Sequence, residues 1–223
     1  YKRQLFGYSP LFADIAELLL NLEPRLTIVC GKRQLPEVTA LDLSCDISIV
    51  CLDKLTDSTF LGLGIQQKRA LGISFGSPFI FKKREIDMFK GNILNSHGAP
   101  LPQFKGGGGF SWRILQGDKR GASLMHVVTT AIDEGPIVFR KDFVFGDEDT
   151  IPLHYQNKQL RHDREHLLPW LIGVMTGKVL LNPQESERLP ESPERQFQTY
   201  FPRLLTDFHA AIDWSWNAEH LQR

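Results

Sequence analysis

The chain has 223 residues, of which 42% are hydrophobic, enough to bury a full core in one domain or in a large domain with an appendage. Its 26 basic side chains balance 26 acidic ones, which argues against a bulk nucleic-acid binder of the ribosomal or histone kind. No apolar run reaches the roughly 18 residues of a membrane helix and no signal-peptide pattern opens the chain, so we expect a cytoplasmic protein.

The three cysteines, Cys30, Cys45 and Cys51, lie in apolar surroundings without the spacing of metal ligands, so we expect buried, reduced thiols. Tyr1 is not an initiator methionine, and Arg223 falls inside an expected helix. We therefore expect the chain to be trimmed at both ends.

The first half of the chain alternates short apolar runs with helical patterns, which is typical of parallel βαβ units. Helices are expected over 11–22, before Pro24, and over 84–89. Buried strands are expected over 26–30 and 47–52, which are short, β-branched and bounded by polar turns, and further strands over 4–7, 72–75 and 92–95. Together they predict an α/β fold with a Rossmann-like open, mostly parallel sheet flanked by helices.

Pro100 and Pro102 predict an extended segment after the strand over 92–95. Four glycines, 106–109, then precede a helix that runs to about residue 115. Because no Gly-Lys-Ser/Thr follows them, we favour close packing or substrate approach over a phosphate cradle or a flexible linker.

Strands over 123–128 and 136–145 flank a loop that contains Asp133. This arrangement predicts that Asp133 lies at the C-terminal edge of the sheet, where open α/β folds bind ligands.

The region 149–175 is expected to be mainly helical, with His162 and His166 four residues apart on one face. Since no HExxH motif or third ligand accompanies them, a solvated polar face is favoured over a metal pair. Residues 182–198, rich in Pro, Glu, Ser and Arg, are typical of a linker. Beyond them, Trp214 and Trp216 are more typical of packing anchors than of a ligand platform.

Asn95, His97 and Asp133 carry side chains suited to acyl transfer. A histidine titrates near pH ~6.5 and can move the proton that an attacking amine loses. An asparagine amide can donate a hydrogen bond to a developing oxyanion without adding charge, and a carboxylate can orient the imidazole. A lone Asn-x-His is more often turn chemistry or a structural polar pair, so the surrounding motifs decide.

Those motifs occur in a fixed order: Asn95-Ser96-His97, Leu101-Pro102, Lys105-Gly106, Trp112 and Asp133-Glu134-Gly135. Their order and spacing resemble the formyltransferases that use 10-formyltetrahydrofolate, among them glycinamide ribonucleotide transformylase, methionyl-tRNA formyltransferase and the sugar N-formyltransferases. The resemblance covers about residues 71–145, with a weaker echo near the C-terminus. Gly98-Ala99 stand where many relatives carry Pro-Ser, which changes the loop and leaves the three catalytic positions intact.

The resemblance implies direct formyl transfer without a metal, in which Asn95 and protonated His97 stabilise the oxyanion while Asp133 holds His97 and an ordered water. It implies 10-formyltetrahydrofolate as co-substrate, bound by a loop before the catalytic strand and by a second segment before Asp133; ordinary packing is the alternative for both. The implied cofactor-binding residues are Gly76, Ser77, Pro78, Phe79, Phe81, Val128, Thr130 and Ile132. The implied substrate-binding residues are Tyr8, Ser9, Lys105 and Gly106.

We expect a catalytic domain over 1–180, followed by a linker and a truncated C-terminal extension over 181–223. The extension contains Ile212-Asp213-Trp214, and this organisation most resembles that of the sugar N-formyltransferases. The implied substrate is the primary amine of a nucleotide-linked amino sugar, as in lipopolysaccharide O-antigen biosynthesis. We expect no nucleic-acid or membrane partner, and a homodimer stays open. The alternatives are a methionyl-tRNA formyltransferase and a catalytically inactive relative that binds folate or a nucleotide.

Overall fold

A computed structural model describes residues 2–19, 26–43, 47–56, 70–107, 109–181, 199–205 and 215–218. The following sequence predictions therefore lie wholly or partly outside the described residues: Cys45, the end of the helix over 11–22, the glycine run over 106–109, the linker over 182–198, the segment Ile212-Asp213-Trp214 and the helix expected at Arg223.

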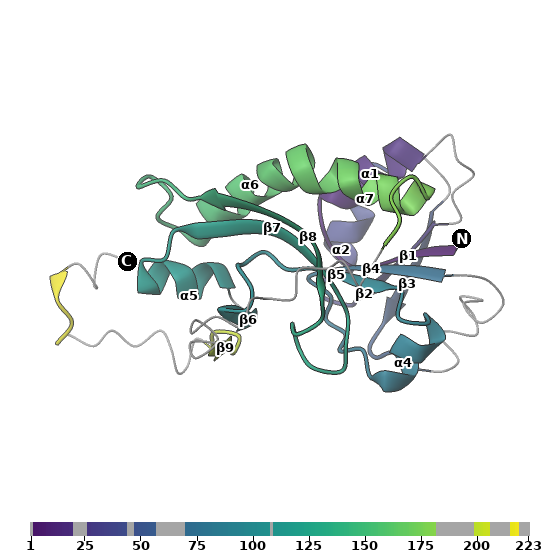
Figure 1. Ribbon diagram of the computed structural model, residues 1–223, viewed down its shortest axis with the longest axis horizontal. Coiled ribbons are helices and arrows are strands. Elements are labelled where there is room, and N and C mark those ends of the chain that lie inside the picture. Colours follow the sequence, from purple (N-terminus) through teal and green to yellow (C-terminus); the bar gives the residue numbers. More distant parts are fainter. Residues whose placement is uncertain are drawn as a thin grey trace.

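A seven-stranded sheet in the order β3-β2-β1-β4-β5-β7-β8 forms the centre of the fold (Figure 1). Its first five members are parallel, and β7 and β8 are antiparallel to their neighbours. The strands are β1 (Lys2–Gly7), β2 (Leu26–Gly31), β3 (Ser48–Leu52), β4 (Ala70–Phe75), β5 (Ile93–Ser96), β7 (Arg120–Val127) and β8 (Ile137–Val144). The prediction of a Rossmann-like, mostly parallel sheet flanked by helices is confirmed.

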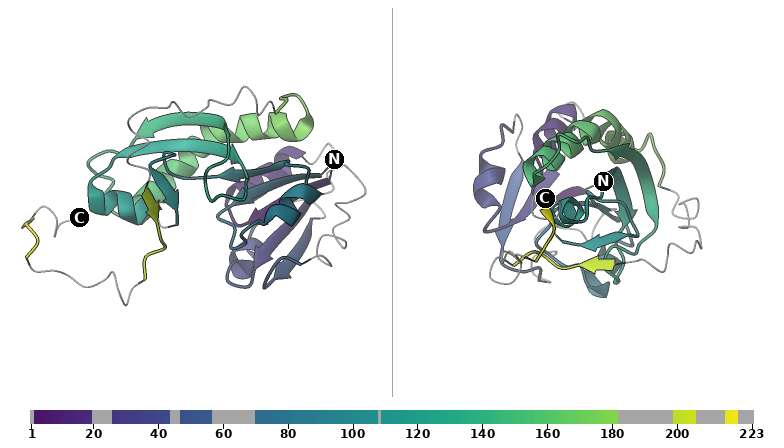
Figure 2. Two further views of the ribbon diagram at one scale, coloured as in Figure 1. Left: turned by 60° about the horizontal axis from the view of Figure 1, so that its bottom comes forward. Right: turned by 90° about the vertical axis from the view of Figure 1, so that its left-hand side faces the viewer.

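Helices cover both faces of the parallel strands, and the two views of Figure 2 show the layers. One face packs against α1 (Leu11–Leu19) and α7 (Leu168–Thr176), which together with β1, β2 and β4 form the larger hydrophobic core. The other face carries α4 (Lys83–Met88) and a second core around Phe6, Phe81 and Phe89. Two-sided burial explains why β2 and β4 have nearly continuous apolar runs.

A nearly continuous helix runs from the β7–β8 end of the sheet to the β1 end (Figure 1). It consists of α6 (Pro152–His162), the π-helical turn Asp163–Leu167 and α7. Pro169 lacks an N–H and its ring displaces the carbonyl of Glu165, so a wider turn is the physical solution at this point. The predicted helix over 149–175 is therefore correct in extent, apart from its first three residues.

The order of strands reverses between β1 and β4, the place where open α/β sheets bind ligands. Gly7 ends β1 with φ +94°, and a Cβ there would lie 2.2 Å from the carbonyl oxygen of Phe75. Only glycine allows the two strand ends to approach this closely. Tyr8 continues the contact, because its N–H donates to the same oxygen at 3.1 Å.

The segment after β5 differs from the prediction of an extended chain. Residues 101–103 form a turn, closed by a hydrogen bond from the N–H of Phe104 to the carbonyl of Pro100 (3.1 Å). The turn leads into β6 (Phe104–Gly106), which pairs in parallel with β9 (Thr199–Phe201), and α5 (Gly109–Gln116) follows. Neither β6 and β9 nor the short helix α2 (Leu35–Thr39) is predicted by the sequence.

The pairing of β6 with β9 brings residues from near the C-terminus against the loop that follows His97. Phe104 and Phe201 stack with ring centroids 5.3 Å apart, and Trp112 donates its indole N–H to the carbonyl of Pro202 (2.8 Å). The domain boundary at residue 180 stays a prediction, but the part over 199–205 packs directly on the region that carries the motifs.

Candidate active site

Asn95 lies near the end of β5 with its side-chain amide held on both sides. Its Oδ1 accepts a hydrogen bond from the hydroxyl of Ser74 on β4 at 2.7 Å. Its Nδ2 lies 3.1 Å from Nε2 of His126, the residue opposite Asn95 on the antiparallel strand β7. Two partners on two neighbouring strands therefore fix the orientation of the Asn95 amide.

The second partner, His126, can be assigned a tautomer from its contacts. Its Nδ1 lies 3.1 Å from the carbonyl oxygen of Val127, which can only accept, so Nδ1 carries the proton and Nε2 accepts from Asn95. Among the described residues, the second N–H of the Asn95 amide has no acceptor. That N–H is the group that could stabilise an oxyanion. The bulge in the β7–β8 pairing between Met125 and His126 lies at this position.

His97 follows β5 and is tied at three points. Its backbone N–H donates to the carbonyl of Leu124 (3.1 Å), and its Nε2 lies 2.6 Å from the carbonyl oxygen of Phe104, which requires a proton on Nε2. Its Nδ1 faces Oδ2 of Asp133 at 3.7 Å. Burial lowers the pKa of His97, and the nearby Asp133 carboxylate partly opposes that shift. The resting ring is therefore neutral near neutral pH, with Nδ1 as its proton acceptor.

Asp133 is held in a strained backbone conformation between the two histidines. It has φ +53°, in the left-handed region that side chains other than glycine seldom adopt. Its Oδ2 accepts the backbone N–H of Gly106 at 2.8 Å, and its Oδ1 lies 3.4 Å from Nε2 of His126. Burial alone would raise the pKa of Asp133, but the imidazoles of His126 and His97, which favour the carboxylate when protonated, and the Gly106 N–H outweigh it and lower that pKa. The carboxylate is therefore ionised beside Nδ1 of His97.

The sharp turn after Asp133 depends on Gly135. A Cβ at this position would lie 1.7 Å from the carbonyl oxygen of Val127, so no other residue fits. The short Asp-x-Gly spacing thus has a local structural cause: the chain must pass close to the end of β7 to present the Asp133 side chain.

The four expected substrate-binding residues lie in two separate regions of the fold. Lys105 and Gly106 lie on β6 next to Asp133, where Lys105 is buried and pairs with Glu134 (Nζ to Oε1, 2.8 Å). Tyr8 and Ser9 lie at the switch point after β1, and Ser9 is buried with its Oγ accepting the N–H of Leu11 at the start of α1 (3.2 Å). The Gly106 N–H and the Ser9 hydroxyl are thus both engaged within the protein.

The first expected cofactor segment follows β4. Gly76 has φ +52° and its carbonyl accepts from Gln34 (3.0 Å), while Ser77 accepts the N–H of Phe79 (3.1 Å). Phe79 and Phe81 are 8% and 6% exposed and belong to the core around Phe6. Their side chains therefore support the loop from beneath, and the exposed apolar side chain between them is Ile80, at 71%.

The second expected cofactor segment leaves the end of β7. The N–H of Val128 donates to the carbonyl of Ile93 (2.8 Å), which joins this segment to the strand that carries Asn95. Thr130 is exposed and Ile132 is 45% exposed. The exposed apolar side chain of Ile132 thus lies directly before Asp133 in the chain.

Three residues of the cluster escape the sequence argument: Ser74, Phe104 and His126. His126 lies in a predicted strand, but only the antiparallel register of β5 and β7 puts it opposite Asn95. The available signal was a histidine in an otherwise apolar strand.

Within the described ranges, no group of three or more His, Cys, Asp or Glu side chains could hold a metal ion. His162 and His166 contact each other, with ring centroids 4.4 Å apart. No helix among the described residues is long and apolar enough to cross a membrane.

Sequence comparison finds a family match in this region. Residues 79–169, which include Asn95, His97 and Asp133, match the family model described as Formyl transferase. Methionyl-tRNA formyltransferase of Thermodesulfovibrio yellowstonii is 25% identical over 207 residues, covering 92% of this chain and 63% of that protein. The enzyme of the same name from Trichlorobacter lovleyi is 29% identical over 157 residues, covering 67% and 45%. The chain thus spans less than two thirds of the length of these relatives.

Structural comparison shows the same fold. WlaRD, a sugar 3N-formyltransferase solved in the presence of dTDP and 5-N-formyl-THF, has a TM-score of 0.72 at 17% identity, covering 99% of this chain and 76% of that one. The Helicobacter canadensis N-formyltransferase, solved with folinic acid and dTDP-3-aminofucose, has a TM-score of 0.71 at 14% identity, covering 99% and 78%. Glycinamide ribonucleotide transformylase 1 from Symbiobacterium toebii has a TM-score of 0.62 at 15% identity, covering 81% and 89%.

Proposed function

We propose that this chain, which contains a formyl transferase domain, transfers a formyl group from 10-formyltetrahydrofolate to the primary amine of a nucleotide-linked amino sugar. The observation that carries the proposal is the convergence of Asn95, His97 and Asp133 at one edge of the sheet. 10-Formyltetrahydrofolate would supply an activated formyl group whose carbonyl oxygen gains negative charge in the transition state.

The donor set fits that chemistry. The N–H of Asn95 that faces no described acceptor can donate to the oxygen as its charge develops. The contact of Oδ1 with Ser74 and that of the other N–H with His126 keep the amide from turning away. A preoriented neutral donor of this kind stabilises the transition state more than the ground state.

Proton transfer falls to His97. Because its resting ring is neutral, Nδ1 can take up the proton that the attacking amine loses. The proton then lies beside Oδ2 of Asp133, and the ionised carboxylate stabilises the imidazolium. When the bond between the formyl carbon and the folate nitrogen breaks, the proton would pass from His97 to that nitrogen, and tetrahydrofolate would leave. The sequence-based mechanism started from a protonated His97; burial favours a neutral start followed by protonation during the reaction.

The cofactor is assigned to the loop over 76–81 and the segment over 128–132. The exposed apolar side chains of Ile80 and Ile132 can contact a flat ring, while the backbone of both loops can supply polar contacts. Phe79 and Phe81 would act from the core by supporting the loop, and the substrate-binding roles of Tyr8, Ser9, Lys105 and Gly106 remain part of the proposal.

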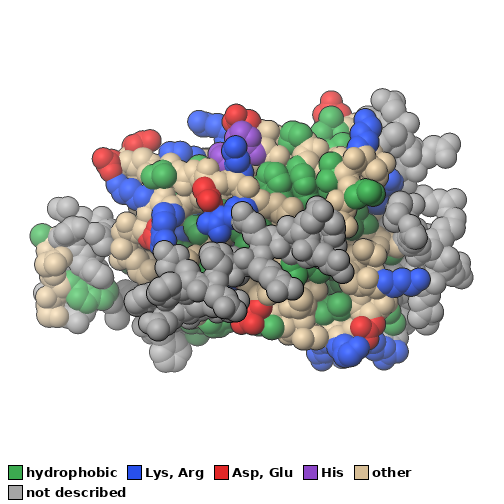
Figure 3. Space-filling model, in the orientation of Figure 1, with side chains coloured by type: hydrophobic (Ala, Val, Ile, Leu, Met, Phe, Trp, Pro, Cys, Tyr) green, Lys and Arg blue, Asp and Glu red, His purple; other side chains and the backbone are tan. Residues whose placement is uncertain are grey.

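Two observations favour a sugar nucleotide as substrate. Solved sugar N-formyltransferases align with this chain at TM-scores of 0.71–0.72, whereas the methionyl-tRNA formyltransferase from Clostridium thermocellum, which also covers 99% of the chain, aligns at 0.59. On the face shown in Figure 3, Lys and Arg side chains are interspersed with Asp and Glu, and where they gather at the lower right, over α4, the helix also contributes Glu85 and Asp87. A tRNA would instead call for a continuous basic surface.

Methionyl-tRNA formyltransferase activity is the second candidate function, because the relatives from Thermodesulfovibrio yellowstonii and Trichlorobacter lovleyi are methionyl-tRNA formyltransferases. Purified protein should be incubated with 10-formyltetrahydrofolate and either dTDP-linked amino sugars or methionyl-tRNA, with tetrahydrofolate release and product mass as readouts. We expect formylation of an amino sugar. Formylation of methionyl-tRNA alone would replace the substrate, and no transfer to either would remove the proposed activity.

A further inference from the structure

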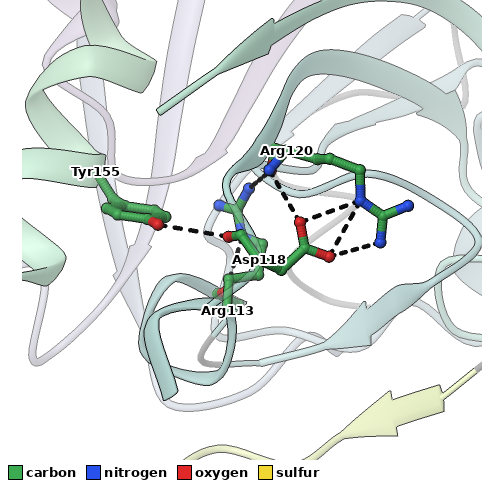
Figure 4. A network of polar contacts seen from close by, with 5 residues as sticks. Arg113, Asp118, Arg120 and Tyr155 are labelled. Atoms are coloured by element: carbon green, nitrogen blue, oxygen red, sulfur yellow. Dashed lines mark hydrogen bonds and ion pairs between the residues drawn. The ribbon is translucent and has the colours of Figure 1, made fainter. Parts of the chain in front are cut away.

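Arg113 on α5 is fully buried, with 0% of its surface exposed. Among the described residues, no carboxylate pairs with its guanidinium. Asp118, whose charge acts on Arg113, forms its ion pair with Arg120 instead: Nη2 of Arg120 lies 2.5 Å from Oδ2 of Asp118 (Figure 4). Burial lowers the pKa of Arg113 to about 10, so the group is still charged at neutral pH.

Backbone carbonyls and aromatic rings replace the missing carboxylate. The guanidinium donates to the carbonyls of Gly98 (2.9 Å), Gly109 (3.0 Å) and Arg120 (2.6 Å). Its carbon lies 5.1–6.0 Å from the centroids of four rings, a range typical of cation–π contacts. The rings belong to Phe104, Phe110, Phe145 and Tyr155. An apolar side chain of similar volume would fill the same space without the cost of burying a charge.

Two of these contacts lead to His97. Gly98 is the next residue in the chain, so the hydrogen bond to its carbonyl fixes the backbone on one side of His97. Phe104, whose ring Arg113 faces, supplies the carbonyl that binds Nε2 of His97. Arg113 thus spans both ends of the turn between Gly98 and Phe104, and this turn sets the position of the imidazole.

We propose that Arg113 is a positioning residue for proton transfer at His97: it clamps the turn from Gly98 to Phe104, so that Nδ1 of His97 faces Asp133. The inference rests on the proposed formyl transfer. Three charged or titratable groups face His97, namely Asp133 from the β7–β8 loop, His126 from β7 and Arg113 from α5.

The test compares Arg113→Met, which keeps the volume but removes the charge and the donors, with Arg113→Lys, which keeps the charge but not the three-way contact. Ile114→Ala serves as a control, because Ile114 is the next residue of α5, is 8% exposed and belongs to the cluster of Phe145 and Tyr155, whereas Ala99 and Phe104 of the turn belong to another cluster. Thermal unfolding, kcat, KM and the NMR titration of the His97 ring are measured for each variant.

We expect Arg113→Met to lower kcat about 10-fold or more relative to Ile114→Ala at similar stability, with KM nearly unchanged, because misplacing a catalytic group by a fraction of an ångström affects mainly the transition state. The His97 titration should move to higher pH, because a positive charge is removed. Arg113→Lys should restore the titration but not kcat. A kcat within about 2-fold of Ile114→Ala in both Arg113 variants would overturn the proposal.

Two further outcomes of the experiment are interpreted separately. If Arg113→Met does not fold, Arg113→Lys decides: low kcat at control-like stability supports the clamp, and wild-type kcat overturns it. If the wild-type protein formylates no amine, the proposed function fails, and the substrate-free NMR spectra decide on Arg113. A displaced His97 titration and altered ring signals in Arg113→Met, absent in Ile114→Ala, support the clamp; unchanged signals overturn it.

Discussion

Asn95 and His126 meet across neighbouring antiparallel strands, with Nδ2 of the amide 3.1 Å from Nε2 of the imidazole. The contact leaves one N–H of Asn95 for the reaction and gives His126 a role that differs from that of His97. His126 orients the oxyanion donor, whereas His97 moves the proton. The same nitrogen of His126 lies 3.4 Å from Asp133, so the orienting residue also borders the carboxylate.

The variant His126→Phe tests this division. Phenylalanine fills the buried site but cannot accept from Asn95, so the amide loses one of its two anchors and kcat should fall roughly 10- to 100-fold. In an Asn95→Ala background, His126→Phe should lower kcat little further, because the two residues act as one unit. Additive losses in this double-mutant cycle would contradict the orienting role.

His97→Asn and Asp133→Asn should each lower kcat by roughly 100-fold or more while leaving the fold intact, because both remove a group that handles the proton. Near-wild-type turnover in either variant would remove its catalytic assignment. Circular dichroism and unfolding curves provide the control for folding.

The pH dependence of kcat should carry the signature of a buried histidine. Burial lowers the pKa of His97, so wild-type kcat should hold constant down to a pH below ~6.5 and then fall as Nδ1 becomes protonated. The Asp133 carboxylate opposes that lowering, so the residual activity of Asp133→Asn should show its acid limb at still lower pH. A shift to higher pH would contradict the electrostatic coupling between Asp133 and His97.

Phe201→Ala should loosen β9 and, through it, β6, which presents the Phe104 carbonyl to His97 and the Gly106 N–H to Asp133. Loss of this buried ring should cost about 3 kcal/mol of stability. Amide exchange over 104–106 should rise and kcat should fall. The exposed neighbour Arg203 supplies the control, since Arg203→Ala should leave both unchanged. Unaltered exchange over 104–106 in Phe201→Ala would show that β6 holds without β9.

Asp163 should make the free energy of unfolding depend on pH, and this effect can be tested separately from catalysis. Burial raises its pKa to about 6, while hydrogen bonds from Ser123 and Gln159 partly oppose the shift. Because the folded pKa exceeds the unfolded value of about 3.9, its contribution to stability is complete below pH ~4 and is lost as the pH rises through about 6. The loss amounts to about 3 kcal/mol.

Asp163→Asn cannot ionise, so its stability relative to wild type should increase between pH ~4 and pH ~7. Urea unfolding at several pH values measures this difference. Asp142→Asn on the surface of β8, where the side chain is 61% exposed, should show no such trend. A flat difference for Asp163→Asn would mean that this carboxyl group titrates normally.

Binding of a 5-formyl folate analogue should protect the amides of 76–81 from hydrogen exchange. The loop carries the exposed Ile80 above a core formed by Phe79 and Phe81, so a ligand can cover it without rearranging the core. Protection that appeared only at other segments would place the cofactor elsewhere. The amides of Gln156 and Asn157, two exposed residues of α6, serve as an internal reference.

Short-range patterns in the sequence were enough to predict the parallel sheet. Alternating strand and helix segments specify βαβ units locally, and two-sided burial makes β2 and β4 largely apolar. The strands β1, β2, β3, β4 and β5 were all expected within a few residues. Asn95 and His97 could be paired for a similar reason, because a single residue separates them at the end of one strand.

The surroundings of these residues required the tertiary structure. The antiparallel register puts His126 opposite Asn95, and the turn after Pro100 returns Phe104 to His97, where the prolines alone predict an extended chain. Phe79 and Phe81 could be placed in a loop but not on its inner side, because hydrophobicity does not tell which face of a loop is buried. Which residues contact Asn95 and His97 depends on strand register, on chain reversal and on packing between segments that are distant in sequence. No local pattern encodes these.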